Sequence, residues 1–144
     1  MAISKEKVEE VLKLEAFDRY DYFIKRVKET EKFFVLEDEN NDLEIMDLGD
    51  AEAIAVWPDQ EFADIFIQGE WKDCNIKRYS LKHLKSTLLP TCKKKQWEID
   101  VFPLIDKSGV VASYSDVEKD LQPKERVKRN PRVRNKKKRD NTKY

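Results

Sequence analysis

The chain has 144 residues, of which 40% are hydrophobic, 40% are charged and 10% are aromatic. This composition supports one hydrophobic core and argues against disorder over most of the length. No apolar run approaches the roughly 18 residues that a membrane span requires, and the first residues, MAISKEKVEEV, lack the apolar stretch of a signal peptide, so we expect a cytoplasmic protein with no membrane association.

The first part of the chain has the spacing of two amphipathic helices. Apolar residues at i, i+3 and i+4 predict a short helix over residues 4–12, opened by Ser4, and a longer helix over residues 17–30. Acidic residues near the start of the second helix and basic residues near its end complement the helix dipole. The apolar stripe of this helix consists of Tyr20, Phe23, Ile24 and Val27.

The apolar period then changes to that of β-strands. Residues 32–36 and 43–46 are rich in apolar residues and are separated by the turn-forming segment 37–42, which together predict a hairpin. A third strand is expected over residues 53–57. It ends at Pro58, because proline has no N–H to donate to a neighbouring strand.

Helix and strand signals alternate in the next part of the chain. Asp59 is a favourable N-cap for a helix over residues 60–68, and Gly69 suits the left-handed residue that follows a helix. A short strand over residues 76–79 and a helix over residues 81–96 come next.

Two strands and a helix are predicted for the end of the folded part. Pro90 lies inside the predicted helix over residues 81–96 and should disturb it, because proline cannot donate a helical hydrogen bond. Strands over residues 99–105 and 110–113 are joined by a turn, and the capping-box residues 115–118 open a last helix. These interleaved elements predict an α+β fold with a mostly antiparallel sheet of about five or six strands and helices packed on one face.

The charge is unevenly distributed, although 29 Lys and Arg residues balance 29 Asp and Glu residues overall. Eleven basic and two acidic residues give residues 124–144 a net charge of +9, so residues 1–123 carry −9. We therefore predict an acidic globular domain over residues 1–122 and a basic tail over residues 123–144 with a composition typical of disorder.

The segment VWPDQEFADIFIQGEWKDC, residues 56–74, has two interpretations. In the first, Trp57 ends a strand, Trp71 packs over the end of a helix, and the acidic residues between them start that helix. In the second, two tryptophans and two acids converge on a ligand or active-site pocket, because paired carboxylates can perform acid–base chemistry. The residues of this candidate pocket are Trp57, Glu61, Glu70 and Trp71.

Motifs for enzyme chemistry are lacking. The three glycines lie far apart, which leaves no phosphate-binding loop, and Cys74 and Cys92 do not form a CxxC pair. The single histidine, His83, cannot form a zinc site without further ligands. We predict no catalytic residue, no metal site and no cofactor, and we favour a non-enzymatic function.

Acidic residues gather in the predicted hairpin. They are either ordinary solvated loop charges or a docking face for a basic protein, since charge complementarity raises association rates and specificity. The residues of this candidate acidic face are Glu37, Asp38, Glu39, Asp42 and Glu44.

The basic tail has three interpretations. It would bind nucleic acid through its phosphates, in a salt-sensitive manner, or fold back on its own acidic domain, or have no specific role. Two prolines and the lack of an apolar stripe argue against a helix on a membrane surface. The basic residues concerned are Lys128, Arg129, Arg132, Arg134, Lys136, Lys137, Lys138 and Arg139.

Five blocks of sequence carry a resemblance to a known family. Together they resemble the domain of unknown function 2750, a family of small bacterial proteins, over roughly residues 17–121. The resemblance implies a compact bacterial cytosolic domain and no defined reaction or cofactor. The blocks are RYDYFIKRV (19–27), FFVLEDE (33–39), AVWPDQEFADIFIQGEW (55–71), YSLKHLKSTLLP (79–90) and DVFPLIDKSGVVAS (100–113).

Three functions are therefore considered. The first is a non-enzymatic module that binds an unknown protein partner, with an analogy of size and acidity to immunity proteins that bind toxins. The second is a nucleic-acid-associated protein that uses its basic tail. The third is a small-ligand binder or enzyme built on the two tryptophans and two acids described above.

Overall fold

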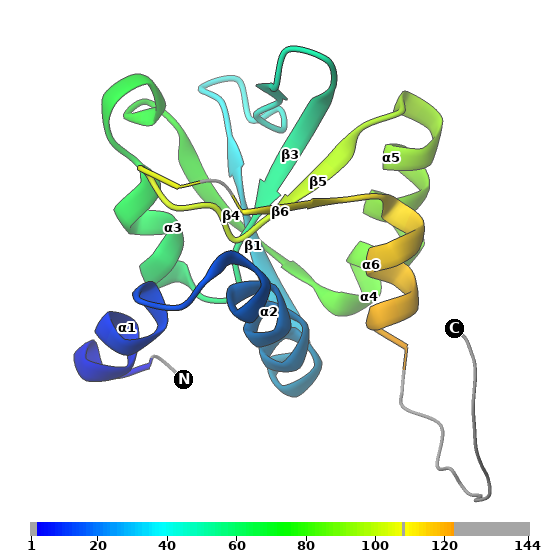
Figure 1. The fold of residues 1–144 in the computed structure, drawn as a ribbon. Helices are drawn as coiled ribbons and strands as arrows, with labels where there is room; N and C mark the ends of the chain where they lie inside the picture. The colour runs from blue at the N-terminus through cyan, green and yellow to red at the C-terminus, as the bar shows by residue number, and fades with distance from the viewer. Residues whose placement is uncertain (1–2, 108, 123–144) are drawn as a thin grey trace, which may run out of the picture.

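The computed structural model describes residues 3–107 and 109–122 (Figure 1), so the predicted basic tail lies outside the described residues. The helices are α1 (Lys5–Leu12), α2 (Ala16–Thr30), α3 (Gln60–Phe66), α4 (Leu81–His83), α5 (Leu89–Lys95) and α6 (Tyr114–Asp120), with a 3₁₀ turn at Gly69–Trp71 and a π-helical segment at Leu84–Leu88. The strands are β1 (Lys32–Glu37), β2 (Met46–Asp47), β3 (Glu52–Val56), β4 (Asn75–Ser80), β5 (Glu98–Val101) and β6 (Val110–Ala112).

The strands form two sheets, one of order β1-β4 and one of order β2-β3-β5-β6. All pairs are antiparallel except β3 with β5, so the predicted α+β fold with a mostly antiparallel arrangement is confirmed. A single bridge joins the two sheets, because Phe34 and Trp57 exchange backbone hydrogen bonds of 2.9 Å in both directions. Helix α2 packs against β1, β5 and β6 and lies in front of the strands in Figure 1.

The predicted hairpin of residues 32–36 with 43–46 is wrong in its main pairing. Strand β1 pairs along its whole length with β4, whereas it meets the other segment only at the bridge between Glu37 and Leu43. Strand β2 pairs instead with β3. Five of the six β1 residues are buried, so the edge of β1 needs a partner along its whole length. Strand β4 has six residues and provides this partner, whereas β2 has only two.

Alternation along β3 and β5 gives the second sheet two different faces. These strands are parallel, with Ile54 opposite Ile99 and Ala55 opposite Asp100. Side chains of paired residues point to the same face, and neighbours along a strand point to opposite faces. One face therefore carries the aliphatic side chains of both strands, and the other carries the alanines of β3 beside two carboxylates of β5, Glu98 and the buried Asp100.

The predicted helix over residues 81–96 forms as a continuous helical run through α4, the π-helical segment and α5. The irregularity lies where Pro90 was expected to disturb it, since the amide of Leu89 bonds to the carbonyl of Leu84 across five residues. A π-helical turn is a common way to accommodate a residue that cannot take part in the normal ladder. The run ends at Gln96, which has a left-handed φ of 62°.

Serine side chains cap the starts of α1 and α6, although the cap of α6 is not the serine that was predicted. The side chain of Ser4 accepts from the amide of Lys7 at 3.0 Å, as predicted for α1. Helix α6 begins two residues before the predicted capping box, because Ser113 accepts from the amide of Asp116 at 3.1 Å.

The two ends of α3 also differ from their expected caps. Asp59 lies at the N-cap position of α3, but its carboxylate makes no capping bond and instead pairs with Arg26. At the other end the helix stops at Phe66, so Gly69, with a φ of 61°, begins the 3₁₀ turn rather than ending α3.

None of the helices within residues 3–107 and 109–122 is long and apolar enough to cross a membrane. The large buried side chains form one cluster that draws on both sheets and on helices α2, α3, α5 and α6. Its largest fully buried hydrophobic members are Trp57, Phe23, Phe33, Phe102, Ile54, Leu84, Leu89, Ile99 and Leu121.

Candidate functional site

Trp57 is a core residue. Its side chain is fully buried, and its indole Nε1–H donates a hydrogen bond of 3.0 Å to the carbonyl oxygen of Pro103. Its ring packs on Phe66 of α3 with the ring centroids 5.0 Å apart. A buried indole with its N–H satisfied stabilises the fold and leaves no polar group for a ligand.

The structure does not bring the four residues of the predicted pocket together. Glu61 is half-buried on α3, Glu70 is exposed on the 3₁₀ turn, and neither lines a hollow among the described residues together with Trp57. Only Trp71 borders an open space. It is half-buried and packs on Phe66, with ring centroids 5.7 Å apart.

The space beside Trp71 is a hollow of about 350 Å³. It lies between the segment 46–48, the end of α3 with the 3₁₀ turn, and the segment 103–107 that follows β5. This volume falls in the range of ligand-binding pockets. Its apolar wall includes Met46, Leu48, Phe66 and Trp71, and its charged side chains are Asp100, Asp106 and Lys107.

Asp100 is the chemically unusual member of this hollow. Its side chain is 3% exposed, and its Oδ1 has no hydrogen-bond partner among the described residues. Burial raises the pKa of this carboxyl, and the amide of Gly109 and the charge of Arg19 oppose that increase. A buried polar oxygen without a partner is rare, because it has lost its water without a replacement.

Gly109 makes the close approach to this carboxylate possible. A Cβ at this position would lie 2.2 Å from the carbonyl oxygen of Val101 and 2.7 Å from Oδ1 of Asp100. Only glycine therefore allows the returning chain to pass this closely over β5. The sequence signal for this contact is an aspartate inside an apolar strand with a glycine nine residues later, a pattern too general to predict it.

The guanidinium of Arg19 acts on Asp100 through its charge and forms no ion pair with it. Arg19 is 1% exposed and donates to the carbonyl oxygens of Phe102 at 3.1 Å and Leu14 at 2.8 Å. These bonds hold its charge at the junction of α2 and the segment after β5. Its electrostatic influence reaches both Asp100 and Asp106.

The predicted acidic face is only partly exposed. Glu37 is buried and accepts a hydrogen bond of 3.2 Å from the hydroxyl of Tyr79, so it adds no exposed charge. Asp38 uses Oδ1 to accept from the amides of Asn40 and Asp42, which fixes the turn after β1. The side chains of Glu39 and Asp42 are exposed.

A second segment contributes to this face. Glu44 is half-buried and accepts from the thiol of Cys74 at 3.7 Å. The pKa of Cys74 is raised to about 11, first by burial and then by Glu44, Asp38 and Asp73. Asp73, which we had not included, therefore lies near the predicted residues. Sequence reasoning missed it because the pairing of β1 with β4 is what brings the segment before β4 beside the end of β1.

We call the whole surface the acidic end. In Figure 1 its two segments, 38–52 and 70–74, lie at the same end of the molecule, at the top of the view. The hollow with Asp100 opens between these segments and residues 103–107, so the buried carboxylate lies beside the exposed ones. The acidic end comprises Asp38, Glu39, Asp42, Glu44, Asp47, Asp50 and Asp73.

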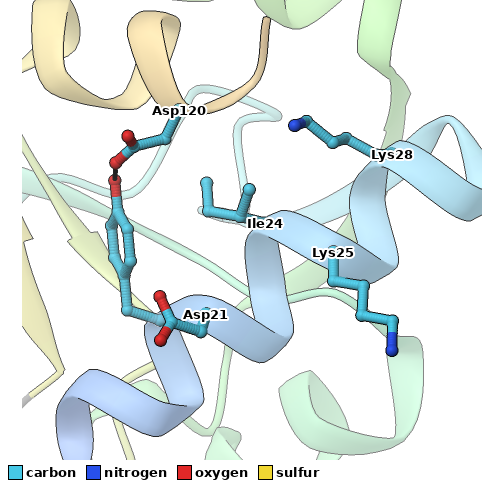
Figure 2. Close-up of a pocket in the computed structure, with 6 residues that line it drawn as sticks. Asp21, Ile24, Lys25, Lys28 and Asp120 are labelled. Atoms are coloured by element: carbon cyan, nitrogen blue, oxygen red, sulfur yellow. Dashed lines mark hydrogen bonds between the residues drawn. The ribbon is translucent and has the colours of Figure 1, made fainter. Parts of the chain in front are cut away.

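A larger hollow of about 600 Å³ lies between α2 and the end of α6 (Figure 2). The hydroxyl of Tyr20 donates to Oδ2 of Asp120 there, and burial and this contact raise the pKa of Tyr20. Lys25 points away from Asp120 in Figure 2. Because the carboxylate is already bonded and the rim carries charges of both signs, this hollow is best explained as a seam between two helices.

The remaining candidates for chemistry are the thiols and the histidine. Burial raises the pKa of Cys92 to about 11, so this thiol, like that of Cys74, is protonated at neutral pH and is a poor nucleophile. The ring of His83 stacks on Tyr79, with centroids 4.2 Å apart and planes 5° apart. Within the described part of the chain, no group of three or more His, Cys, Asp or Glu residues could hold a metal ion.

The fold and this end of the molecule define a small α+β domain with an acidic, hollowed surface. The chain belongs to the family described as "Protein of unknown function (DUF2750)", whose model matches residues 20–121. This match confirms the resemblance found in the sequence. A comparison with curated proteins finds no match. The description of the family names no activity, so the function must be argued from the site.

Proposed function

We propose that the chain is a non-enzymatic module that binds a basic protein through its acidic end. The observation that supports this function is that the carboxylates of the acidic end are not neutralised by basic side chains of the described residues. No carboxylate of the acidic end has an ion-pair partner in the part of the chain that the structure describes. Ion pairs form elsewhere, between Lys7 and Glu10 and between Arg26 and Asp59.

Unpaired like charges on one surface repel each other and raise the energy of the free protein. A basic partner relieves this repulsion and is steered toward the surface over about 8 Å at physiological ionic strength. Such complementarity acts mainly on the association rate and on specificity. The acidic end is therefore suited to fast and selective capture of a cationic protein.

The cysteines favour a binding role over covalent catalysis. Both thiols have pKa values raised to about 11, so neither supplies a thiolate at neutral pH. The one histidine, His83, is stacked on Tyr79 and therefore offers no paired base for a nucleophile. The described residues of the acidic end supply several carboxylates, which accept hydrogen bonds, but no nucleophile paired with a base.

Charge reversal at the acidic end tests the proposal. Glu39, Asp42 and Asp50 are exposed, and their side chains make no hydrogen bond among the described residues, so changing all three to Lys leaves the fold intact. A control with Glu9, Glu29 and Glu118 changed to Lys alters the net charge equally on other surfaces. Both variants and the wild type are used to isolate partners from the native cell, with quantification by mass spectrometry.

We call the protein with Glu39, Asp42 and Asp50 changed to Lys the acidic-end variant. A discrete basic protein should be recovered with the wild type and with the control, and its amount should fall at least tenfold with the acidic-end variant. The isolation is repeated after nuclease treatment, since partners held through nucleic acid are then removed. Equal retention by the two variants would contradict a role for the acidic end.

A second candidate is nucleic-acid association through the basic tail. Its support is the net charge of +9 on residues 124–144. Phosphate neutralisation predicts binding that weakens steeply with salt. A chain that ends at residue 121 should lose binding to nucleic acid, and a loss below threefold would refute the candidate.

The resemblance supports a setting for this function. We propose that the protein works in the bacterial cytoplasm and that residues 1–122 form the domain that docks the partner, with residues 123–144 as a separate basic tail. The acidity of the domain supports an immunity-like role, in which the basic partner is a toxin. Co-expression with a candidate toxin, with and without the acidic-end variant, tests this role by cell survival.

A further inference from the structure

The hollow beside Trp71 is lined in part by Asp100, a carboxylate with one unpaired oxygen. Asp100 is almost completely buried, and its Oδ1 bonds to none of the described residues. Leaving such an oxygen unpaired costs free energy, which a ligand with a donor group recovers on binding. Asp100 is also one of the residues that line the hollow of about 350 Å³.

No cation among residues 3–107 and 109–122 forms an ion pair with Asp100. Arg19 donates instead to the carbonyl oxygens of Phe102 and Leu14. Lys107 lines the hollow together with Asp106, so two carboxylates face one ammonium there. The hollow therefore has a net negative lining, and residues of both segments of the acidic end, Met46, Leu48 and Trp71, border it.

The wall of the hollow suits a flat cation. Trp71 and Phe66 pack together with centroids 5.7 Å apart and planes 32° apart, and both border the open space. Aromatic faces attract cations, and a guanidinium stacks on them more readily than an ammonium does. A guanidinium is also less strongly hydrated, so it loses less when it enters a partly enclosed space.

The hollow is lined by the segment 46–48, by the pair Phe66 and Trp71, and by Asp100 with residues 103–107. The hollow is large enough for one long side chain, which is the usual form of an anchor in an interface.

We propose that this hollow receives an arginine side chain of the basic partner, with its guanidinium on Asp100 and its stem against Trp71. The inference rests on the proposed function, because it names the group by which the partner is held at the acidic end. The exposed carboxylates guide the partner to the surface, and the hollow fixes one of its residues. Arginine is enriched among the residues that dominate binding energies.

The test uses a defined probe and the full chain. N-acetylarginine amide is titrated into the labelled protein, and the indole N–H resonance of Trp71 is followed by NMR. N-acetylcitrulline amide, which has the same shape without the charge, is the matched control. We expect saturable binding of the arginine probe in the millimolar range, as is typical of one side chain, and at least fivefold weaker binding of the citrulline probe.

Two variants connect the binding to the hollow. Asp100→Asn should weaken the arginine probe at least fivefold, and Asp116→Asn, at an exposed site on α6, should leave it unchanged. Leu48→Lys places a competing cation at the rim and should also weaken binding. Because Leu48 is partly exposed, Leu48→Lys still tests the inference if Asp100→Asn alters the fold. Equal binding of both probes, or binding that neither variant weakens, overturns the inference.

The source of the arginine is tested in the full chain with every arginine of the tail changed to Gln. These residues are Arg126, Arg129, Arg132, Arg134 and Arg139. An unchanged probe affinity supports an external partner, whereas an increase of more than threefold shows that the tail occupies the hollow and overturns the assignment to a partner.

Failure of the inference can be told apart from failure of the proposed function. If the partner is lost with the acidic-end variant but not with Asp100→Asn, the arginine site in the hollow is refuted and the docking function is retained. Binding of the arginine probe without any partner lost from the acidic-end variant refutes the docking function and keeps the cation site.

Discussion

The indole Nε1–H of Trp57 donates a hydrogen bond of 3.0 Å to the carbonyl oxygen of Pro103. This bond connects the end of β3 to the segment that leaves β5, and that segment forms one wall of the hollow. The buried indole therefore positions the wall without facing the ligand space. The second tryptophan of the segment, Trp71, has the opposite role, because it borders the open space.

The two tryptophans should differ in their effect on stability. Trp57→Ala removes a fully buried aromatic side chain and should lower the free energy of unfolding by about 3–5 kcal/mol. Trp71→Ala removes a half-buried ring and should cost about 1–2 kcal/mol, since less apolar area is lost. Urea unfolding followed by circular dichroism gives both values. Equal losses would show that Trp71 belongs to the core as fully as Trp57 does.

The ion pair of Arg26 with Asp59 should contribute more than a surface pair. Arg26 Nη2 lies 2.9 Å from Asp59 Oδ1, Nε lies 3.1 Å from both carboxylate oxygens, and the Asp59 side chain is 5% exposed. Asp59→Ala leaves a partly buried guanidinium less well bonded and should cost about 2–3 kcal/mol, somewhat below the loss for fully buried pairs.

The exposed pair of Lys7 with Glu10 is the matched control for that change. Its atoms lie 3.2 Å apart at 47% and 69% side-chain exposure. Glu10→Ala should therefore cost less than about 0.5 kcal/mol. Similar losses from Asp59→Ala and Glu10→Ala in chemical unfolding would show that the buried pair has no special role.

The thiols should be slow to react in the native protein. The pKa of Cys92 is raised to about 11 by burial, and that of Cys74 to about 11 by burial and by Glu44. At pH 8 both are therefore almost fully protonated, so alkylation by iodoacetamide should be far slower than for a free cysteine. Mass spectrometry should show Cys74 modified before the buried Cys92, and both modified rapidly in urea. Rapid native labelling of Cys92 would contradict its burial.

The stability contributed by Asp100 should depend on pH in a defined direction. Burial raises its pKa in the folded state above the ordinary value of about 3.9. The folded state therefore holds this proton more tightly than the unfolded state, and stability falls as pH rises from that ordinary value through the raised one. Above the raised pKa the full cost of burying the ionised group is present.

Asp100→Asn should remove that cost. The variant should be more stable than the wild type at pH 7. Its advantage should shrink as pH falls and be smallest well below about 3.9, where Asp100 is protonated in both states. The amide oxygen of Asn can still accept from Gly109. Thermal unfolding from pH 3 to pH 8 gives the difference, and a difference that stays constant over this range would contradict an ionised Asp100.

Local signals in the sequence predicted most of the elements. Ser4 caps α1 as expected, and the stripe of Tyr20, Phe23 and Val27 is the buried face of α2. These features depend on neighbours within a few residues, and so a single sequence contains them. The shift of the last cap from residue 115 to Ser113 is a competition between two nearby serines, which the pattern alone does not resolve.

The pairing of strands was harder to predict. The turn after Glu37 suggested a hairpin, but β1 is buried on both faces and takes β4 as its partner from almost 40 residues later. Which distant strand pairs with β1 is decided by packing of the whole core, and no local pattern records it. The same long-range pairing brings Asp73 to the acidic end.

The candidate site was predicted in part. Trp71 and most of the acidic end were named from the sequence, whereas Asp100 was missed, because a single aspartate in an apolar strand is equally compatible with an exposed edge. Its role follows from Gly109, Trp71 and the segment 103–107 closing around it, which is a property of the tertiary structure.

The central claim is that the acidic end captures a basic protein, and its most direct test is the association rate of the purified partner at several salt concentrations. We expect the wild type and the control with Glu9, Glu29 and Glu118 changed to Lys to associate rapidly at low salt and more slowly as salt rises. The variant with Glu39, Asp42 and Asp50 changed to Lys should associate at least tenfold more slowly at low salt, with little further dependence on salt. Equal association rates for all three proteins at low salt would contradict the claim.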